Sequence, residues 1–121
     1  MTSIGSNDDT LINKKCVPCH GGVSALTPDE AKRMLSRLVS SEKDGWQIVE
    51  DGKAIKREFK FPDFYRTMSF VNAVAHIANV EDHHPDIECG WGYARIRYQT
   101  HAIGGLHEND FICAAKIDAL G

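Results

Sequence analysis

Histidine and acidic side chains gather in the C-terminal third of the chain, where they could transfer protons. Asp82, His83 and His84 fall where a long predicted helix ends, His101 falls where a predicted strand ends, and Asp110 opens the last predicted helix. The ends of such elements are where a small domain usually carries its chemistry. The negative end of the helix dipole, together with Asp82, favours a protonated imidazole. We therefore expect His83 or His84 to titrate near neutral pH, where a general acid or base works best.

Simpler roles remain open for the same residues. A lone surface histidine is usually only solvated, and a histidine at a helix end can cap the last carbonyl groups. Asp110 on its own is typical of a helix start. A zinc site built from His83, His101 and Asp110 is disfavoured, because adjacent histidines rarely bind one ion and no H-x-x-x-H spacing lies on a helix. The favoured interpretation is an acid–base site without a metal ion.

The segment CVPCH, which starts at Cys16, suggests a different chemistry, because C-x-x-C-H is the attachment pattern of a c-type haem. Haem attachment needs an oxidising compartment, and the polar, acidic N-terminus is unlike a secretory signal. The motif is also only half of a zinc site, because Cys89 and Cys113 are not spaced as a second pair. His20 could join Cys16 and Cys19 as a third ligand, but a fourth is missing. We expect a cytoplasmic protein with free thiols, in which this segment packs on the domain and binds neither haem nor zinc.

The bulk composition is that of one ordinary globular domain. The 121 residues are 42% hydrophobic and 26% charged, with a formal net charge of −3. Lysine and arginine are scattered, so no nucleic-acid footprint is expected. No apolar run approaches the roughly 20 residues that a membrane span needs. These properties favour a small enzyme or binding module over a DNA-binding or membrane protein.

Hydrophobic periodicity and turn signals predict the elements that must position these residues. They are a helix over 28–40, a hairpin of two strands over 46–61, a helix over 62–83, a strand over 93–100 and a helix over 108–120. This α-β-β-α-β-α order predicts an α+β fold, in which three helices pack on one face of an antiparallel sheet of three to four strands. An optional fourth strand would lie near 88–92. Residues 1–26 are expected to form an irregular N-terminal segment, and residues 27–121 a single domain.

Local signals mark the bounds of these elements. Thr27 is a fitting N-cap, and Glu30 completes a capping box. Asp51-Gly52 is a preferred pair for a tight hairpin turn. Pro62 is expected to open the long helix, and Pro85 to end it near His83. The apolar stripes of this helix predict that it lies across the sheet, largely buried.

The C-terminal motifs resemble the signature of the pterin-4a-carbinolamine dehydratases. In that family an HHP segment ends the long helix, a T-H dipeptide follows a strand, and an aspartate opens the last helix. The matching positions in this chain are His83, His84, Pro85, Thr100, His101 and Asp110.

The resemblance covers the whole chain from LTPDEA onward, and bacterial members also share a C-x-P-C-x-G-G lead-in that accounts for CVPCHGG. The chain departs from the family at Asn79, where many members carry glutamate. It also departs at His107, where serine or threonine is usual, and this should weaken the helix cap.

This resemblance implies the dehydration of 4a-hydroxytetrahydrobiopterin to quinonoid dihydropterin by histidine acid–base catalysis, without a metal or an organic cofactor. His83 and His101 would be the acid–base pair, and His84 would bind and orient the pterin. Asp110 would hold a nearby histidine, and Asp82 would support the cluster. The implied catalytic residues are His83, His84 and His101, and the implied substrate-binding residues are Asp82, His84, Thr100 and Asp110.

The resemblance also implies partners. They are a pterin substrate, a second copy or further copies in a homodimer or homotetramer, and a functional link to an aromatic amino acid hydroxylase. The third strand or the last helix is the expected contact between copies. The alternative function is a binding module that acts as a dimerisation or transcriptional cofactor without essential catalysis.

Overall fold

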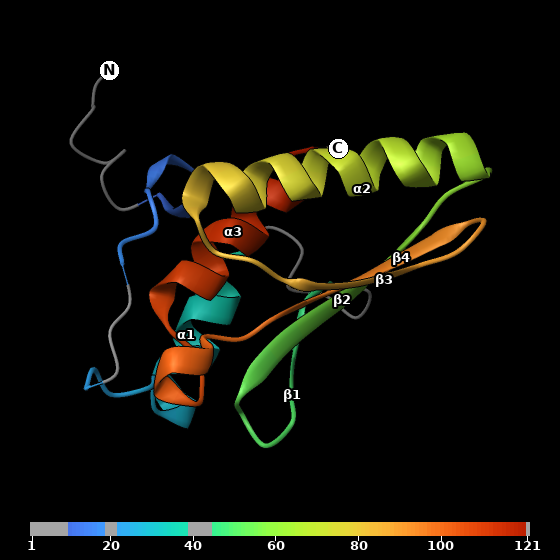
Figure 1. Cartoon of the computed structure of the whole chain (residues 1–121). Coiled ribbons are helices and arrows are strands. Elements are labelled where there is room, and N and C mark those ends of the chain that lie inside the picture. Colours follow the sequence, from blue (N-terminus) through green and yellow to red (C-terminus); the bar gives the residue numbers. More distant parts are fainter. Residues whose placement is uncertain (1–9, 19–21, 39–44, 121) are drawn as a thin grey trace.

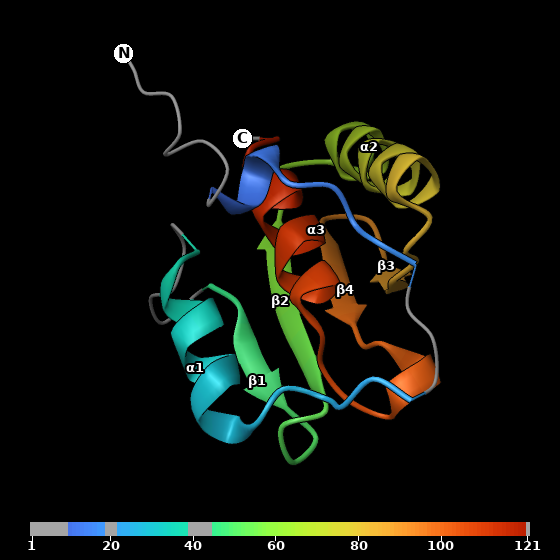
Figure 2. The ribbon, with the colours of Figure 1, turned by 90° about the vertical axis from the view of Figure 1, so that its left-hand side faces the viewer.

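The chain folds into two layers, a four-stranded antiparallel sheet and three helices that cover one of its faces (Figure 1). The computed structural model describes residues 10–18, 22–38 and 45–120. Viewed from the side, α3 (Glu108–Asp118) lies between α1 (Pro28–Ser36) and α2 (Phe64–Glu81) (Figure 2). The predicted α+β class, the element order and the single helical face are confirmed.

The first helix starts at its predicted cap. Thr27 Oγ1 accepts a hydrogen bond from the Glu30 N–H, and the Glu30 carboxylate accepts one from the Thr27 N–H. The helix ends at Ser36, one turn before the predicted end at Ser40, which lies outside the described residues. Arg37 closes it by donating its N–H to the Met34 carbonyl, which is the tighter hydrogen bonding of a last helical turn.

The hairpin joins β1 (Gln47–Val49) to β2 (Ala54–Lys60). Asp51 and Gly52 occupy the centre of its turn with positive φ angles of 58° and 85°, as the sequence predicts. The Lys53 N–H closes the turn on the Glu50 carbonyl at 3.1 Å. β1 is short, so it pairs only with residues 54–56 of β2, and residues 57–60 of β2 extend past the end of β1.

The long helix α2 differs from its prediction in two ways. It begins at Phe64 rather than at Pro62, because the Asp63 side chain caps it by accepting from the Arg66 N–H. It is also buried on one side only, since Phe64 is 50% exposed and Val80 53% exposed. The prediction of a largely buried helix is therefore wrong for the single chain. The reason is that α2 lies at the margin of the helical layer, with α3 on one side of it (Figure 2).

The optional fourth strand is present as β3 (Asp86–Cys89), and it pairs with β4 (Tyr93–Tyr98). The sheet order is β1-β2-β4-β3, so β4 has hydrogen-bonded neighbours on both sides. The predicted third strand is thus an interior strand. Among the described strands it has no free edge with which to extend the sheet into another copy, and the expected contact between copies stays a prediction.

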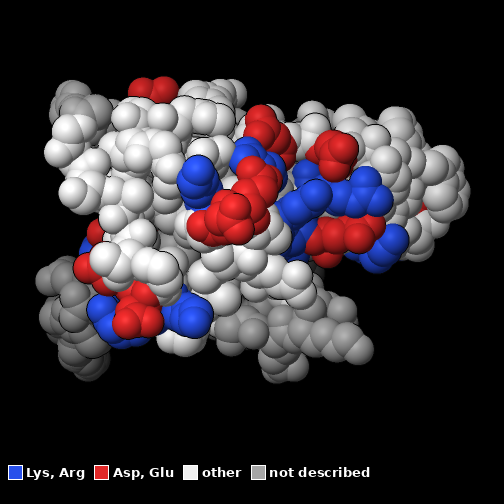
Figure 3. All heavy atoms as spheres, turned by 90° about the horizontal axis from the view of Figure 1, so that it is seen from below, with Lys and Arg blue, Asp and Glu red and all other residues white. Residues whose placement is uncertain are grey.

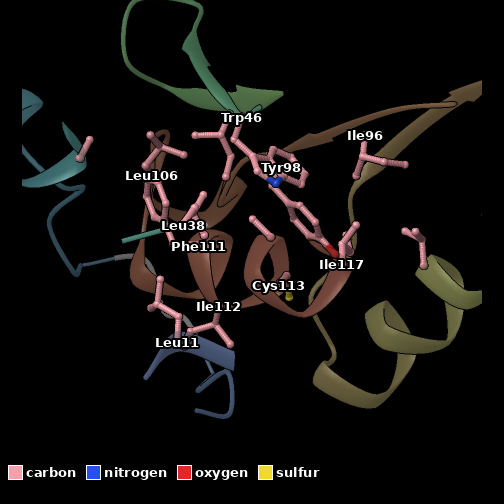
Figure 4. Close-up of a cluster of buried hydrophobic side chains, with 14 of the residues drawn as sticks. Leu11, Leu38, Trp46, Ile96, Tyr98, Leu106, Phe111, Ile112, Cys113 and Ile117 are labelled. Atoms are coloured by element: carbon pink, nitrogen blue, oxygen red, sulfur yellow. The ribbon is translucent and has the colours of Figure 1, made fainter. Parts of the chain in front are cut away.

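The core lies between the sheet and α3. Its largest fully buried side chains come from both layers and include Trp46, Tyr98 and Phe111 (Figure 4). Leu11, from the short 3-10 helix η2 (Leu11–Asn13), joins this core at 4% exposure. The described part of the N-terminal segment therefore packs on the domain rather than forming a loose tail.

The opposite face of the sheet carries interleaved charges of both signs (Figure 3). Arg97 pairs with Glu50 and Asp86, and Arg95 lies near Glu58 and Glu88. Because cations and anions alternate across the strands, this face is a solvated ion-pair ladder. None of the helices in the described part of the chain combines the length and apolar composition of a membrane span.

Candidate active site

The end of α2 sets the direction of the two adjacent histidines. Asp82 takes the left-handed conformation with φ of 52°, which ends the helix, and Asp is one of the few residues that enter this region readily. The His83 N–H then donates to the Ala78 carbonyl at 3.1 Å. After this reversal the His83 side chain faces the protein and is 12% exposed, whereas His84 is exposed.

A fully buried carboxylate, Asp110, holds His83. Its Oδ1 lies 2.6 Å from His83 Nε2, while its Oδ2 accepts from Thr100 Oγ1 at 2.8 Å and from the His107 N–H at 3.0 Å. Asp110 lies in the first turn of α3, where the helix dipole stabilises a negative charge. Both oxygens are hydrogen bonded, which is the condition for burying a carboxylate at a tolerable cost.

These surroundings favour a charged imidazole. Burial of the ring opposes protonation, but the hydrogen bond and the charge of Asp110 outweigh it and raise the pKa of His83 above its usual value. The Tyr98 ring stacks on the imidazole, with centroids 5.4 Å apart and planes 6° from parallel. The surroundings of His83 therefore favour the protonated form of a ring whose Nε2 is hydrogen bonded to a buried carboxylate.

The other adjacent histidine has a neutral partner. His84 Nε2 lies 3.3 Å from the Oδ1 of Asn79, on the exposed side of α2. This is the position at which the chain carries an amide where many family members carry a carboxylate. His84 is thus oriented by a hydrogen bond without a neighbouring negative charge from that residue.

The loop after β4 presents the third histidine. Thr100 and Gly105 form an isolated antiparallel bridge, in which the Thr100 N–H donates to the Gly105 carbonyl at 2.9 Å. Between them the 3-10 helix η3 (His101–Ile103) places His101 at the surface, and Gly104 closes it with a positive φ of 65°. His101 is therefore anchored through its neighbour Thr100, which binds Asp110.

The structure joins some predicted site residues directly and others through neighbours. Asp110 contacts both His83 and Thr100. Among the described residues, no hydrogen bond links the rings of His84 or His101 to that cluster. Asp82 is exposed, and its charge contributes to the raised pKa of His83 after the larger effects of burial and Asp110.

Two contributors were missed from the sequence. Tyr98 is not among the site residues that the sequence predicts, yet its ring stacks on His83. The signal was its spacing from Thr100, since residues two apart on a strand share a face. His107 was expected to be a weak cap, but its Nδ1 accepts from the Asn109 N–H at 3.0 Å and its N–H binds Asp110.

The described residues offer no metal-binding cluster. No group of three or more histidine, cysteine or acidic side chains is arranged to hold a metal ion within residues 10–18, 22–38 and 45–120. Cys19 and His20 lie outside those ranges, so the expectation for CVPCH stays a prediction.

A groove of about 790 Å³ lies elsewhere, along β2, and none of the candidate site residues lines it.

Comparisons with known proteins agree with the motif. Residues 24–120 match the family model described as pterin 4 alpha carbinolamine dehydratase. A protein of Legionella pneumophila (strain Corby), provisionally named pterin-4-alpha-carbinolamine dehydratase, is 50% identical over 110 residues, which cover 91% of this chain and 94% of that protein. A similarly named protein of Nitrosospira multiformis is 51% identical over 112 residues, 93% of each chain.

Solved structures show the same architecture. The crystal structure of a transcriptional coactivator/pterin dehydratase from Brucella melitensis matches with a TM-score of 0.72 and 34% identity, over 80% of this chain and 98% of that one. A pterin dehydratase-like protein identified as a RuBisCO assembly factor matches with a TM-score of 0.56 over 64% of this chain and 90% of that one. At 24% identity, the second likeness concerns the fold alone.

Proposed function

Since the chain belongs to the pterin-4a-carbinolamine dehydratase family, we propose that it removes water from a 4a-hydroxytetrahydropterin to give the quinonoid dihydropterin. The reaction involves no net oxidation: the 4a oxygen leaves as water, and the pterin N5 loses a proton. The observation that carries the proposal is the buried Asp110, which is hydrogen bonded to His83 and raises the pKa of that histidine.

His83 is the proposed acid. Hydroxide is a poor leaving group, so the 4a oxygen must receive a proton as its bond to carbon breaks. Asp110 occupies Nε2 of His83 and thereby directs Nδ1 toward the substrate. The raised pKa favours the form of the ring that carries this proton, which the leaving oxygen then takes. A positioned proton transfer of this kind contributes about 10²–10⁴-fold to a rate.

His101 is the proposed base, and His84 the proposed pterin-binding residue. His101 is exposed on a loop anchored to Asp110 through Thr100, and in this proposal it takes the N5 proton and releases it to water. His84 is held by the neutral Asn79, which suits a residue that binds and orients a ring by hydrogen bonding. Neither role requires a metal or an organic cofactor.

The proposed biological setting follows from the substrate. A 4a-hydroxytetrahydropterin is what an aromatic amino acid hydroxylase releases, so the protein would restore that enzyme's cofactor in the cytoplasm. A homodimer or homotetramer is part of the same proposal.

A second candidate function is a binding role, because the Brucella melitensis relative is titled both a transcriptional coactivator and a pterin dehydratase. In that case the exposed side of α2, with Phe64 and Val80, would contact a protein partner, and the histidines would be dispensable.

The deciding experiment is a coupled assay. Purified protein is added to a phenylalanine hydroxylase reaction, and the decay of the 4a-carbinolamine absorbance is followed. We expect decay well above the spontaneous rate, and loss of that acceleration in His83→Ala. His76→Ala is the matched control, because His76 is an exposed histidine of α2 that lies about two helical turns before His83. Decay at the spontaneous rate with the folded wild type would favour the binding role.

A further inference from the structure

Two cysteines far apart in the sequence touch in the fold. The Sγ atoms of Cys16 and Cys113 lie 3.5 Å apart, although the residues are separated by 97 positions. Cys113 belongs to α3 and is fully buried, whereas Cys16 belongs to the N-terminal segment and is half-buried. Both are free thiols, and so is Cys89, which is exposed. The contact therefore pairs an accessible thiol with an inaccessible one.

Several hydrogen bonds hold Cys16 in this position. Its backbone N–H donates to the Glu81 carboxylate at 2.8 Å, at the end of α2. The next residue, Val17, exchanges two hydrogen bonds with the Asn109 side chain, at 3.1 Å and 2.7 Å. The Cys16 thiol also lies 3.6 Å from the Asn109 carbonyl. The segment is thus fastened to both α2 and α3, with its sulfur over Cys113.

The pKa values of the two thiols are shifted in opposite directions. The hydrogen bond between them keeps a proton on Cys16, whose pKa is raised by that bond and by burial. The same hydrogen bond lowers the pKa of Cys113. The thiolate form, which is the nucleophile toward oxidants, is therefore favoured on the buried Cys113.

We propose that Cys16 and Cys113 form a redox modification site, at which a peroxide converts the two thiols into an intramolecular disulfide. Nothing in the proposed dehydratase reaction uses these residues. The site is a second chemical centre, built by the N-terminal segment on α3.

The reaction balances with hydrogen peroxide as the oxidant. The Cys113 thiolate attacks one peroxide oxygen, the O–O bond breaks, and hydroxide leaves and is protonated to water, so that Cys113 becomes a sulfenic acid. Cys16 Sγ then attacks the Cys113 sulfur, the S–S bond forms, and the sulfenic oxygen leaves as a second water with the Cys16 proton. Two thiols and one peroxide give one disulfide and two waters. Hydrogen peroxide is barely larger than water, and it approaches the pair from the side of the half-buried Cys16, with the contact between the two thiols intact.

The disulfide would affect both the stability of the fold and the candidate active site. A disulfide across 97 positions constrains the unfolded chain strongly, so oxidation should raise the melting temperature. Tyr98 points from β4 toward α3, where Cys113 lies (Figure 4), and its ring stacks on His83. Oxidation removes the Cys113 charge that helps to raise the pKa of His83. An effect on catalysis rests on the proposed function, but disulfide formation does not.

The test is thiol mapping of the full chain. Reduced protein is treated with stoichiometric hydrogen peroxide, remaining thiols are alkylated, and peptides are mapped by mass spectrometry without reduction. We expect a Cys16–Cys113 linked peptide that dithiothreitol releases. We also expect a melting temperature higher by roughly 5 °C or more. Neither readout needs dehydratase activity, so failure here is distinguishable from failure of the proposed function.

Three variants test which cysteines form the disulfide. Cys19→Ser removes the nearest competing thiol in the sequence and should leave the linked peptide intact, as should Cys89→Ser. Cys16→Ser, at a half-exposed position that should tolerate the change, should abolish the linked peptide and the thermal shift and send Cys113 on to sulfinic acid.

A Cys16–Cys19 linkage as the sole product in the wild type would overturn the proposal. So would a Cys113 that stays reduced, or one zinc ion per reduced chain that Cys16→Ser removes.

Discussion

At the scale of single residues, the charge on His83 depends on one buried neighbour. The imidazole is nearly enclosed, and burial alone would favour its neutral form; the hydrogen bond to Asp110 reverses that preference. His84 and His101 have no such neighbour in the described hydrogen-bonding network and stand exposed. Three histidines from one motif are thereby given different environments, which is how one site can hold an acid, a base and a binding group.

The first prediction separates the roles of these histidines. His83→Ala and His101→Ala each remove a proton-transfer group, so each should lower kcat by about 10²-fold or more with a smaller change in KM. His84→Ala removes a binding contact and should mainly raise KM. Steady-state kinetics on both 4a epimers measures this, with His76→Ala as the control. Full kcat in His101→Ala for both epimers would contradict the two-histidine mechanism.

The second prediction concerns Asp110→Asn. The amide keeps the shape but removes the buried charge, so the fold should lose roughly 3 kcal/mol of unfolding free energy, and the pKa of His83 should fall because burial then dominates. Urea unfolding measures the first effect, and the histidine NMR titration measures the second.

The pH dependence of that loss has a definite sign. In the wild type the pKa of His83 is raised by folding, so the stabilisation from its pair with Asp110 is complete below the unfolded value of about 6.5 and is lost as pH rises through the folded pKa. The destabilisation by Asp110→Asn should therefore be larger near pH ~5.5 than near pH ~8.5. An equal loss at both pH values would show that His83 is not the charged partner of Asp110.

At the scale of elements, the left-handed turn at Asp82 aims His83 and His84 in different directions. The helix must end there for His83 to reach Asp110, and Asp82 does this with φ of 52° rather than through a glycine. Asp82 was predicted to support the histidine cluster and to bind substrate. The backbone of Asp82 supports the cluster by ending α2 so that His83 can reach Asp110. Its charge makes a smaller contribution by raising the pKa of His83.

The third prediction tests these two contributions of Asp82. Asp82→Gly and Asp82→Asn both tolerate the left-handed conformation, so each should stay within about 1 kcal/mol of the wild type in unfolding free energy and retain activity. Both remove the charge, so the pKa of His83 should fall slightly in each. Asp82→Val resists a positive φ and should cost about 1–2 kcal/mol and reduce kcat. If Asp82→Asn is as inactive as His83→Ala, the carboxylate itself takes part in binding or catalysis.

At the scale of the whole molecule, the uneven lengths of the strands suggest how copies could join. β1 pairs with residues 54–56 of β2, so within the described chain residues 57–60 have a neighbour on one side only, β4. The groove of about 790 Å³ runs along this edge and is partly lined by Phe59, Phe61 and Phe70. A strand edge beside a groove that is lined by both phenylalanine and charged side chains is a suitable place for a second copy to extend the sheet.

The fourth prediction is that Lys60→Pro weakens oligomerisation without unfolding the chain. The Phe61 N–H donates to Gly92 on the β4 side, so alternation along the strand turns the Lys60 N–H toward the open edge. Proline there removes an edge donor and is tolerated at a strand edge. Sedimentation at micromolar concentration should show a dimer or larger species for the wild type and Lys60→Ala, and a shift toward the monomer for Lys60→Pro. A wild type that sediments only as a 13.4 kDa species would refute oligomerisation altogether.

Much of the architecture could be predicted from the sequence because its signals are local. The capping box at Thr27, the turn at Asp51-Gly52 and the helix end before Pro85 each depend on residues within a few positions of one another, and all three occur in the structure. The C-terminal motif likewise predicted the family, because its residues fall at the ends of successive helices and strands and their spacing can be read along the chain.

The tertiary structure decided what depends on contacts between distant residues. The stacking of Tyr98 on His83, the interior position of β4, the one-sided burial of α2 and the Cys16–Cys113 contact all follow from the sheet order and from the way α3 closes over it. Periodicity reports which face of an element is apolar, but it does not report which neighbour covers that face. For that physical reason the sequence singled out the histidines, whereas only the packed fold showed which of them is hydrogen bonded to a buried carboxylate.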